Sequence, residues 1–445
     1  MCYTVCGFAS SIGSFSCCLE VALQLRDGEV RTEPLQKEDP QLVPSCRPLM
    51  EVLAEVPDPR QQRGKRHPLG ASLALVCVAT LCGDRSSSAM AQWARISPRA
   101  LVRALGCTPA TPPCAATRCT VLRHLDRERL EATLGTWAES VLTHLSTAPT
   151  DEAVDEAVDE AVDEAVDEAV DEPIAIDGKT VRGRRQQGAP QAQLLSARSH
   201  RLGLTLGQRA VAEKTNEITQ IVPLLQGLVL EGRSFTMDAL LTQRTVAQPI
   251  VEGHGDYVLS VKGHQRHLET TIETTSAAVV TQPPRADEPP RTVATTTEQG
   301  HGRRESRRLT ARVAAFDGRD AWPGLRQVFQ VERETWVLAT GRRRQEVVYG
   351  VTSLPPTRAD AARLLRLTRH QWHIENRSHW VRDVPFDADR SQVRCGSTPD
   401  VMAAFPNTAI GLLRALGEPN IAAACRRMAA QPYAALTLLG LTIDN

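Results

Sequence analysis

Hydrophobic positions recur with a helical period from residue 49 to about residue 146. The segments LMEVLAEV, ASLALVCVATLCG and SSSAMAQWAR are separated by polar connections, and the serines of the third suit a helix start. Two further helices are predicted within ATRCTVLRHLDRERLEATLGTWAESVLTHL. We therefore expect an all-helical N-terminal domain over residues 48–146, preceded by a poorly ordered tail over residues 1–47.

The pattern changes after residue 172. PIAIDGKTVRG, QLLSARS and LTLGQRAV are short apolar or β-branched segments bounded by glycine and polar turns, which is typical of strands. The helical segments NEITQIVPLLQGL and TQRTVAQPIVEG then alternate with the strands RSFTMDAL and DYVLSVKG. Because strands that alternate with helices indicate an α/β sheet, we expect an α/β domain over residues 173–415.

Helical signals mostly disappear between about residues 271 and 354. The β-type segments RTVATTTEQ, RRLTARVAAF, QVFQVERETWVLAT and EVVYGVTSL dominate there, and we interpret them as a β-rich insertion in the α/β domain. Helical periodicity returns at TRADAARLLRLTRHQWHIENRSHWVRDV. Residues 416–445 are expected to form a C-terminal helical tail.

Residues 151–172 consist of five DEAV units and a sixth Asp-Glu pair, which places twelve carboxylates in one run. On a helix with 3.6 residues per turn, each unit turns about 40° further than the last, so the acids form no fixed face. Like charges four residues apart also repel. We interpret residues 147–172 as a solvated acidic linker. The alternative is an interaction tail or DNA mimic, whose deletion is expected to abolish function.

The acidic run conceals the charge of the rest of the chain. The whole chain has 52 basic and 52 acidic residues, but without the run 40 acidic residues remain, which leaves a net charge of +12. A basic body of this kind suits a polyanionic partner. The twelve cysteines include no C-x-x-C pair and fit neither a zinc finger nor a disulfide framework, which favours a reducing cytoplasm. The sequence contains no run of ~18 apolar residues, so it predicts no membrane-spanning helix.

Two predicted strands stop at an aspartate, namely Asp177 after IAI and Asp238 after FTM. Both acids are expected at the carboxyl edge of the sheet, where open α/β sheets bind ligands. The late helix adds Glu375, which at 100° per residue shares a face with the apolar positions. Because a carboxylate turned toward the interior is costly unless it meets a cation, the three acids are candidates to hold Mg²⁺. Each acid taken alone has an ordinary alternative, a turn residue for the aspartates and a solvated side chain for the glutamate.

Ordered motifs carry a resemblance to a known family. They read AIDGKTVRG, TMDAL, GDYVLSVKGHQ, EQGHGRRESR, WPGL and HIENRSHWVRDVPFDADRSQVRCG. Together they resemble the DDE transposases of the ISAs1 group, within the IS4-like class. The helical segment with PDPRQQRGKRHPL resembles the N-terminal domain associated with these transposases. The resemblance covers residues 49–413 apart from the acidic run.

The resemblance implies a ribonuclease-H-like catalytic core in which Asp177, Asp238 and Glu375 form the catalytic and metal-binding triad. It also implies two divalent ions, Mg²⁺ or Mn²⁺, and DNA as the substrate, both as the terminal inverted repeats of a transposon and as target DNA. Because two transposon ends are processed together, a homodimer at synapsis is expected. The expected location is the cytoplasm, at the nucleoid.

Six basic residues are candidates for contacts with DNA. Five lie beside strand ends or in the basic turn of the insertion, and the sixth matches the basic position that follows the glutamate in the IS4-like signature. They are Lys179, Arg182, Lys262, Arg303, Arg304 and Arg382. For each of them the alternative is a solvated surface side chain.

The chain departs from the family signature at three positions. Thr368 and Gln371 stand where Tyr and Arg are usual, and His264 stands where Asn is usual. Two alternatives to an active transposase therefore stay open. One is a DNA-binding relic without catalysis, and the other is a structure-selective nuclease built on the same core.

Overall fold

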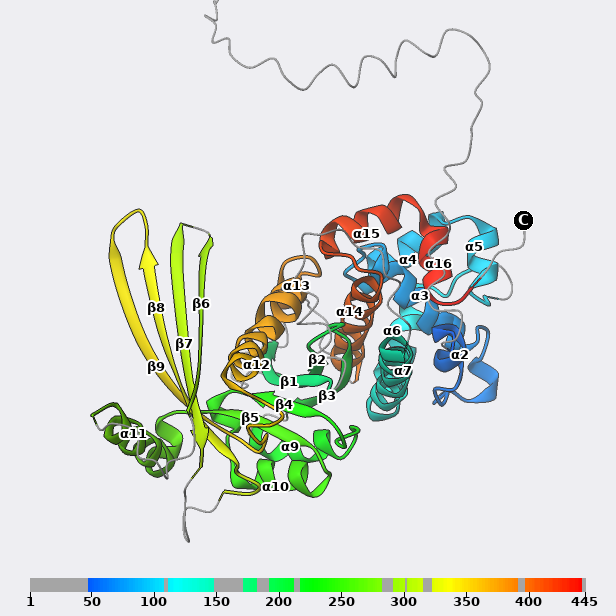
Figure 1. Cartoon of the computed structure of the whole chain (residues 1–445). Coiled ribbons are helices and arrows are strands. Elements are labelled where there is room, and N and C mark those ends of the chain that lie inside the picture. The colour runs from blue at the N-terminus through cyan, green and yellow to red at the C-terminus, as the bar shows by residue number, and fades with distance from the viewer. Residues whose placement is uncertain are drawn as a thin grey trace, which may run out of the picture. The chain divides into compact units, whose positions relative to one another are not determined.

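One nine-stranded sheet organises the computed structural model of this chain, in the strand order β3-β2-β1-β4-β5-β9-β8-β7-β6. The structure describes residues 47–107, 111–147, 171–181, 192–211, 217–281, 291–300, 302–314, 322–390 and 397–441. The order places the expected α/β strands in one half of the sheet and the strands of the insertion in the other (Figure 1).

The first half of the sheet contains β1 (Pro173–Val181), β2 (Ala192–Ser199), β3 (Thr205–Val211), β4 (Ser234–Met237) and β5 (Asp256–Val261). β2 pairs antiparallel with both β1 and β3, whereas β4 pairs parallel with both β1 and β5. A mixed sheet of this kind, with helices in the connections, confirms the α/β class predicted from the alternating pattern.

The second half contains β6 (Thr292–Gly300), β7 (Arg303–Val313), β8 (Gln327–Val337) and β9 (Arg342–Thr352), all joined by antiparallel pairing. β9 also pairs antiparallel with β5, so these strands extend the main sheet. In Figure 1 they form a long curved leaf beside the rest of the sheet.

The helix α11 (Arg266–Thr281) precedes these strands, and the expectation that helical signals end near residue 271 is wrong for its second half. The segment is rich in threonine and valine, which are β-branched and weak helix formers, so its composition resembles a strand. The helix packs against β8 and β9, and this tertiary contact decides its state.

Helices cover both faces of the first half of the sheet. α9 (Glu217–Leu225) and α10 (Arg244–Glu252) lie on one face, and α12 (Ala361–Ile374) crosses the other face beside β1 and β4 (Figure 1). α12 also contacts β6 and β7. It therefore lies where the two halves of the sheet meet.

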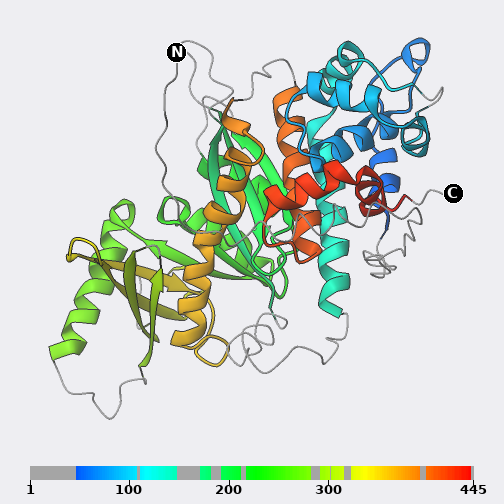
Figure 2. The same ribbon diagram turned by 90° about the horizontal axis from the view of Figure 1, so that it is seen from above.

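The remaining helices form one cluster. From the N-terminal side come α2 (Leu49–Ala54), α3 (Leu69–Leu81), α4 (Ser87–Ile96), α5 (Arg99–Ala104), α6 (Ala115–His124) and α7 (Arg127–Thr147). From the C-terminal side come α14 (Thr398–Ala415), α15 (Ile421–Ala430) and α16 (Pro432–Leu438). Both groups pack on α3, every residue of which is buried, and Figure 2 shows them side by side. The two ends of the described chain thus share one hydrophobic core.

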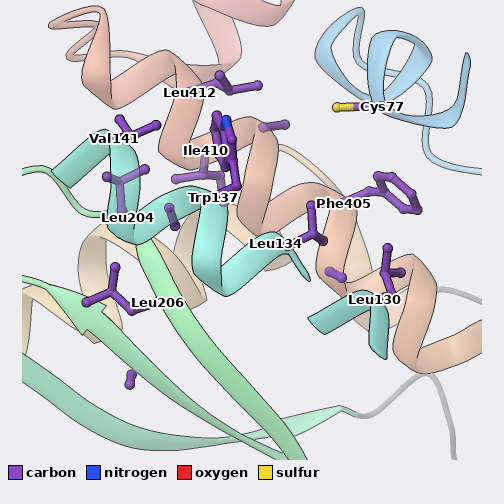
Figure 3. Close-up of a cluster of buried hydrophobic side chains, with 14 of the residues drawn as sticks. Cys77, Leu130, Leu134, Trp137, Val141, Leu204, Leu206, Phe405, Ile410 and Leu412 are labelled. Carbon is purple, nitrogen blue, oxygen red and sulfur yellow. The ribbon is translucent and has the colours of Figure 1, made fainter. Parts of the chain in front are cut away.

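This core continues onto the sheet through α7, β3 and α14. Figure 3 shows Leu134 and Trp137 of α7 with Leu206 of β3 and Phe405 of α14. Gly135 permits the close approach, since a Cβ at that position would lie 2.5 Å from the carbonyl oxygen of Leu206. No described helix has the length and apolar character needed to cross a lipid bilayer.

The last Asp-Glu pair of the acidic run belongs to this fold, and the prediction of a solvated linker up to residue 172 is wrong for these two residues. Asp171 is 1% exposed, and its Oδ2 accepts hydrogen bonds from Arg358 at 2.8 Å and Arg363 at 3.1 Å. Glu172 accepts a hydrogen bond of 3.1 Å from Arg201. The burial of Asp171 and the arginine partners of both acids anchor this pair in the fold, whereas its sequence-identical copies lie outside the described residues.

Candidate active site

Two aspartates lie side by side at the carboxyl edge of the parallel strands. Ile176 of β1 and Met237 of β4 are register partners. Asp177 and Asp238 each come one residue later, and adjacent strands are about 4.8 Å apart. The strand pairing therefore brings together two carboxylates that are far apart in the sequence.

Local hydrogen bonds hold both side chains at this edge. Oδ1 of Asp177 accepts a 2.8 Å hydrogen bond from the backbone N–H of Gly178. Oδ1 of Asp238 accepts a 2.7 Å hydrogen bond from the N–H of Ala239, where a short 3-10 turn begins. Asp238 thus caps the turn that follows β4, whereas Asp177 lies within β1, which continues to Val181, at the point where the parallel pairing with β4 ends.

Glu375 begins the π-helical segment Glu375–His379, which joins α12 to α13 (Trp380–Asp383). Its side chain is exposed, so the expectation that it faces the interior is wrong. The helical wheel assumes 100° per residue, and a π turn widens the helix at this point. Such turns are frequent at functional sites.

A cavity of about 450 Å³ brings the three acids together. Asp177 and Asp238 line it from the sheet, and Glu375 lines it from the end of α12. Its wall also includes Lys262, Gln371, Arg369 and, from the insertion, Glu298, Glu305, Arg307 and Arg333. The insertion therefore forms part of the wall of the same cavity as the acids.

The electrostatics of this cavity favour a cation. Burial raises the pKa of Asp177 to about 7, against the hydrogen bond from Gly178, and the charges of Glu217, Asp238 and Glu375 raise it further. These carboxylates therefore repel one another, which a cation between them would relieve.

The donor set is chemically suited to a hard divalent cation, because such ions prefer carboxylate oxygens. Among the described residues, no three acidic, histidine or cysteine side chains converge closely enough to ligate one ion in this arrangement. Asp238 and Glu375 are both exposed, so their carboxylates are accessible to an ion from solvent.

Behind Asp177 lies a layer of buried polar groups. Nδ1 of His379 is 3.7 Å from Oδ2 of Asp177, and burial lowers the pKa of this histidine to about 3, so the ring is neutral. Lys179 is buried and pairs with Asp383 of α13. These contacts fix strand β1 against the helix that follows Glu375.

Gln371 ties α12 to both aspartate-bearing strands. Its amide nitrogen donates a 3.1 Å hydrogen bond to the carbonyl of Ile176, and its amide oxygen accepts from the hydroxyl of Thr236. At this position, where the family signature has Arg, the chain therefore has a neutral side chain that positions the helix.

Ion pairs connect the insertion to the wall of the cavity. Arg307 bonds Glu298 and Glu305, and Arg333 bonds Glu305 at 2.8 Å. Arg369 of α12 pairs with Glu298. Arg333 and Arg369 were not among the predicted site residues. A single arginine on a strand or helix has no sequence signal that shows which cavity it will line.

The predicted DNA-contacting residues have different environments. Lys262 is exposed at the cavity, and Arg303 and Arg304 are exposed at the start of β7. Lys179 is buried in its ion pair with Asp383, and Arg382 is 2% exposed. These two side chains therefore lie inside the protein and neither contact solvent freely nor reach a DNA surface in this arrangement. Arg182 lies outside the described residues.

Comparison with known proteins gives two family matches. A family described as "Transposase DDE domain" matches residues 168–398, which span all three acids. A second, described as "DDE_Tnp_1-associated", matches residues 50–138, within the helical segment.

Several curated relatives are similar in sequence. "Putative transposase YncI" of Escherichia coli O157:H7 is 31% identical over 256 residues, which are 54% of this chain and 61% of that protein. "H repeat-associated putative transposase YhhI" of Escherichia coli K12 is 31% identical over 249 residues, 54% of this chain and 63% of that protein. "Uncharacterized protein in dhlA 3'region" of Xanthobacter autotrophicus is 30% identical over 295 residues, 65% of this chain and 89% of that protein. The chain thus matches about three fifths of the length of the first two relatives.

Proposed function

This chain belongs to the family of DDE transposases, and from that premise we propose that it is the transposase of an insertion sequence, which cleaves transposon ends and joins them to target DNA. The observation that carries the proposal is the placement of Asp177 and Asp238 on adjacent strands, one residue past the end of their parallel pairing, in one cavity with Glu375. Three carboxylates on three separate elements are a suitable ligand set for phosphoryl transfer with divalent ions.

Asp177, Asp238 and Glu375 would hold two divalent ions, Mg²⁺ or Mn²⁺. Bound ions of this kind lower the pKa of an attacking water or 3′-hydroxyl and stabilise the leaving oxygen. The chain itself orients the reacting groups. Gln371 holds α12 against β1, and the exposed Lys262 is placed to contact a phosphate at the cavity.

The finer assignment is to the ISAs1 group, with a ribonuclease-H-like core. The order β3-β2-β1-β4-β5 with helices on both faces supports that core, and β6–β9 are the insertion in it. We also propose the boundaries 48–146 for the transposase-associated domain and 173–415 for the catalytic domain. By these boundaries α14 belongs to the catalytic domain, although it packs against the N-terminal helices α3, α6 and α7 as well as against α15.

The proposed partners are the terminal inverted repeats and the target DNA, bound by a homodimer at synapsis in the cytoplasm at the nucleoid. The net charge of +12 outside the acidic run supports a polyanionic partner. The exposed Arg303 and Arg304 lie on the same leaf as the residues that wall the cavity, which suits contacts with DNA that enters it.

The test mixes the full chain with labelled transposon-end DNA and Mg²⁺ or Mn²⁺. We expect strand cleavage followed by strand transfer. Asp177→Asn, Asp238→Asn and Glu375→Gln should each remove cleavage and leave DNA binding intact. Glu231→Gln, at an exposed turn, is the matched control and should cleave normally.

The same assay separates the two alternatives. Binding without cleavage under either metal identifies a catalytically inactive relic. Hydrolysis without strand transfer identifies a nuclease. Substantial cleavage by any one of the three triad variants contradicts the assignment of that residue.

A further inference from the structure

A fourth acid, Glu217, lies beside Asp177. It is the first residue of α9, and its side chain is only 9% exposed. Its carboxylate occupies the space directly over Gly178, where the Cβ of any other residue would overlap Oε1. The glycine that follows Asp177 therefore makes room for this carboxylate at the carboxyl edge of the sheet.

Glu217 has neither a hydrogen bond nor an ion pair from its side chain to any of the described residues. The basic residue closest in sequence to Asp177, Lys179, is engaged by Asp383. A buried carboxylate without a partner is costly, and such groups in proteins are paired or bind metals. Glu217 thus differs from the half-buried Glu131, which accepts a 3.1 Å hydrogen bond from Gln208.

The charge of Glu217 acts on both aspartates of the proposed triad. Its contribution to the raised pKa of Asp177 exceeds those of Asp238 and Glu375. Burial raises the pKa of Glu217 itself, and the charge of Asp238 adds to this. Glu217 does not line the cavity itself, but its charge acts on the two aspartates that do, from the helix on the opposite face of the sheet from α12 (Figure 1).

We propose that Glu217 is a fourth carboxylate of this site, which helps Asp177 and Asp238 to hold the divalent cations. The proposal rests on the function proposed above. Its oxygens are the donors that hard cations prefer, and a cation supplies the partner that this buried side chain needs. The geometry of Gly178 and the burial of Glu217 carry the assignment.

The test titrates Mn²⁺ into the full chain and measures bound ion by electron paramagnetic resonance. Glu217→Gln should weaken Mn²⁺ binding by about tenfold or more, as loss of groups around metal sites does. In EDTA the melting temperature of Glu217→Gln should not fall, because the substitution removes a negative charge that repels Asp177 and Asp238. Glu131→Gln, which changes a half-buried glutamate at a separate pocket, is the matched control and should bind Mn²⁺ normally.

Gly178→Ala is a second variant, which displaces the Glu217 carboxylate without removing it and should also weaken Mn²⁺ binding. It keeps the proposal testable if Glu217→Gln does not fold. If Asp177→Asn weakens Mn²⁺ binding while Glu217→Gln and Gly178→Ala do not, the role of Glu217 is overturned and the proposed function stands. If Asp177→Asn also binds Mn²⁺ normally, the metal site itself is refuted and the role of Glu217 falls with it.

Discussion

Nζ of Lys179 lies 2.5 Å from Oδ2 of Asp383, and this ion pair joins the strand of Asp177 to the helix that follows Glu375. The lysine side chain is 8% exposed and the aspartate side chain 30%. A basic residue two positions after Asp177, expected at the DNA, thus acts within the protein to connect two elements of the candidate site.

Replacing this lysine should destabilise the fold. Lys179→Met removes the partner of a partly exposed aspartate, so we expect a loss of about 1–3 kcal/mol in unfolding free energy, measured by urea denaturation. Lys65→Met is the control, because Lys65 lies 3.7 Å from Asp58 in a more exposed pair and should cost less than about 1 kcal/mol. An equal loss in both variants would show that burial of the Lys179 pair has no special effect.

The raised pKa of Asp177 predicts a pH dependence of stability in EDTA. The folded pKa of about 7 lies above the unfolded value of about 3.9, so the folded state binds the proton more tightly. This contribution is present below about pH 4 and is lost as the pH rises through about 7. Urea unfolding at a series of pH values should show stability falling over this window, and Asp177→Asn should reduce the slope.

Glu131 contributes to the same slope, because burial raises its pKa to about 8. Glu131→Gln is therefore the matched comparison and should remove the upper part of the pH dependence. An unchanged slope in Asp177→Asn would contradict the raised pKa of Asp177.

Arg201 bonds described residues on both sides of the acidic run. It donates to the carbonyl of Leu145 at 3.4 Å and to Glu172 at 3.1 Å. Because Leu145 and Glu172 already meet at Arg201, deleting residues 151–170 shortens the chain between two fixed points, and we expect a stability change between zero and a gain of about 1 kcal/mol. Removal of ten carboxylates should also strengthen binding to DNA.

The control for this deletion is Asp171→Ala, which leaves the largely buried side chain of Arg363, 11% exposed, without its carboxylate and should cost about 3 kcal/mol. Both effects are measured by urea denaturation of the full chain. Loss of folding in the deletion, or of end-DNA cleavage, would instead favour the acidic run as a functional element.

The exposed arginines of β7 are expected to contact DNA backbone. Each phosphate contact contributes about −0.9 to the slope of log affinity against log salt, so the double change Arg303→Ala and Arg304→Ala should reduce that slope by up to about 2. Arg427→Ala, on α15 and paired with Glu418, is the control and should leave the slope unchanged. If the double variant and the Arg427→Ala control show the same salt slope, Arg303 and Arg304 do not contact the DNA backbone.

Local patterns predicted the elements of the sheet well. The strand that ends before Asp238 is where the apolar run placed it, and the helix before Glu375 is present. The prediction that a strand stops at Asp177 is wrong, because β1 continues to Val181 through its pairing with β2. The pattern failed at α11, where tertiary packing overrides weak propensity, and at Glu375, where a π turn breaks the regular period. The three acids stay a prediction as site residues, and their convergence on one cavity depends on strand pairing and helix placement that no local pattern records.

The sequence by itself determined the α/β class, the β-rich strands and the candidate acids, because periodicity and strand ends are recorded in neighbouring residues. Only the tertiary structure decided that Lys179 and Arg382 are buried, that the first and last helices share a core, and that Glu217 lies over Gly178. The physical reason is that burial and pairing depend on which distant surfaces meet. An isolated charged residue has the same local sequence signal whether it meets water or another element.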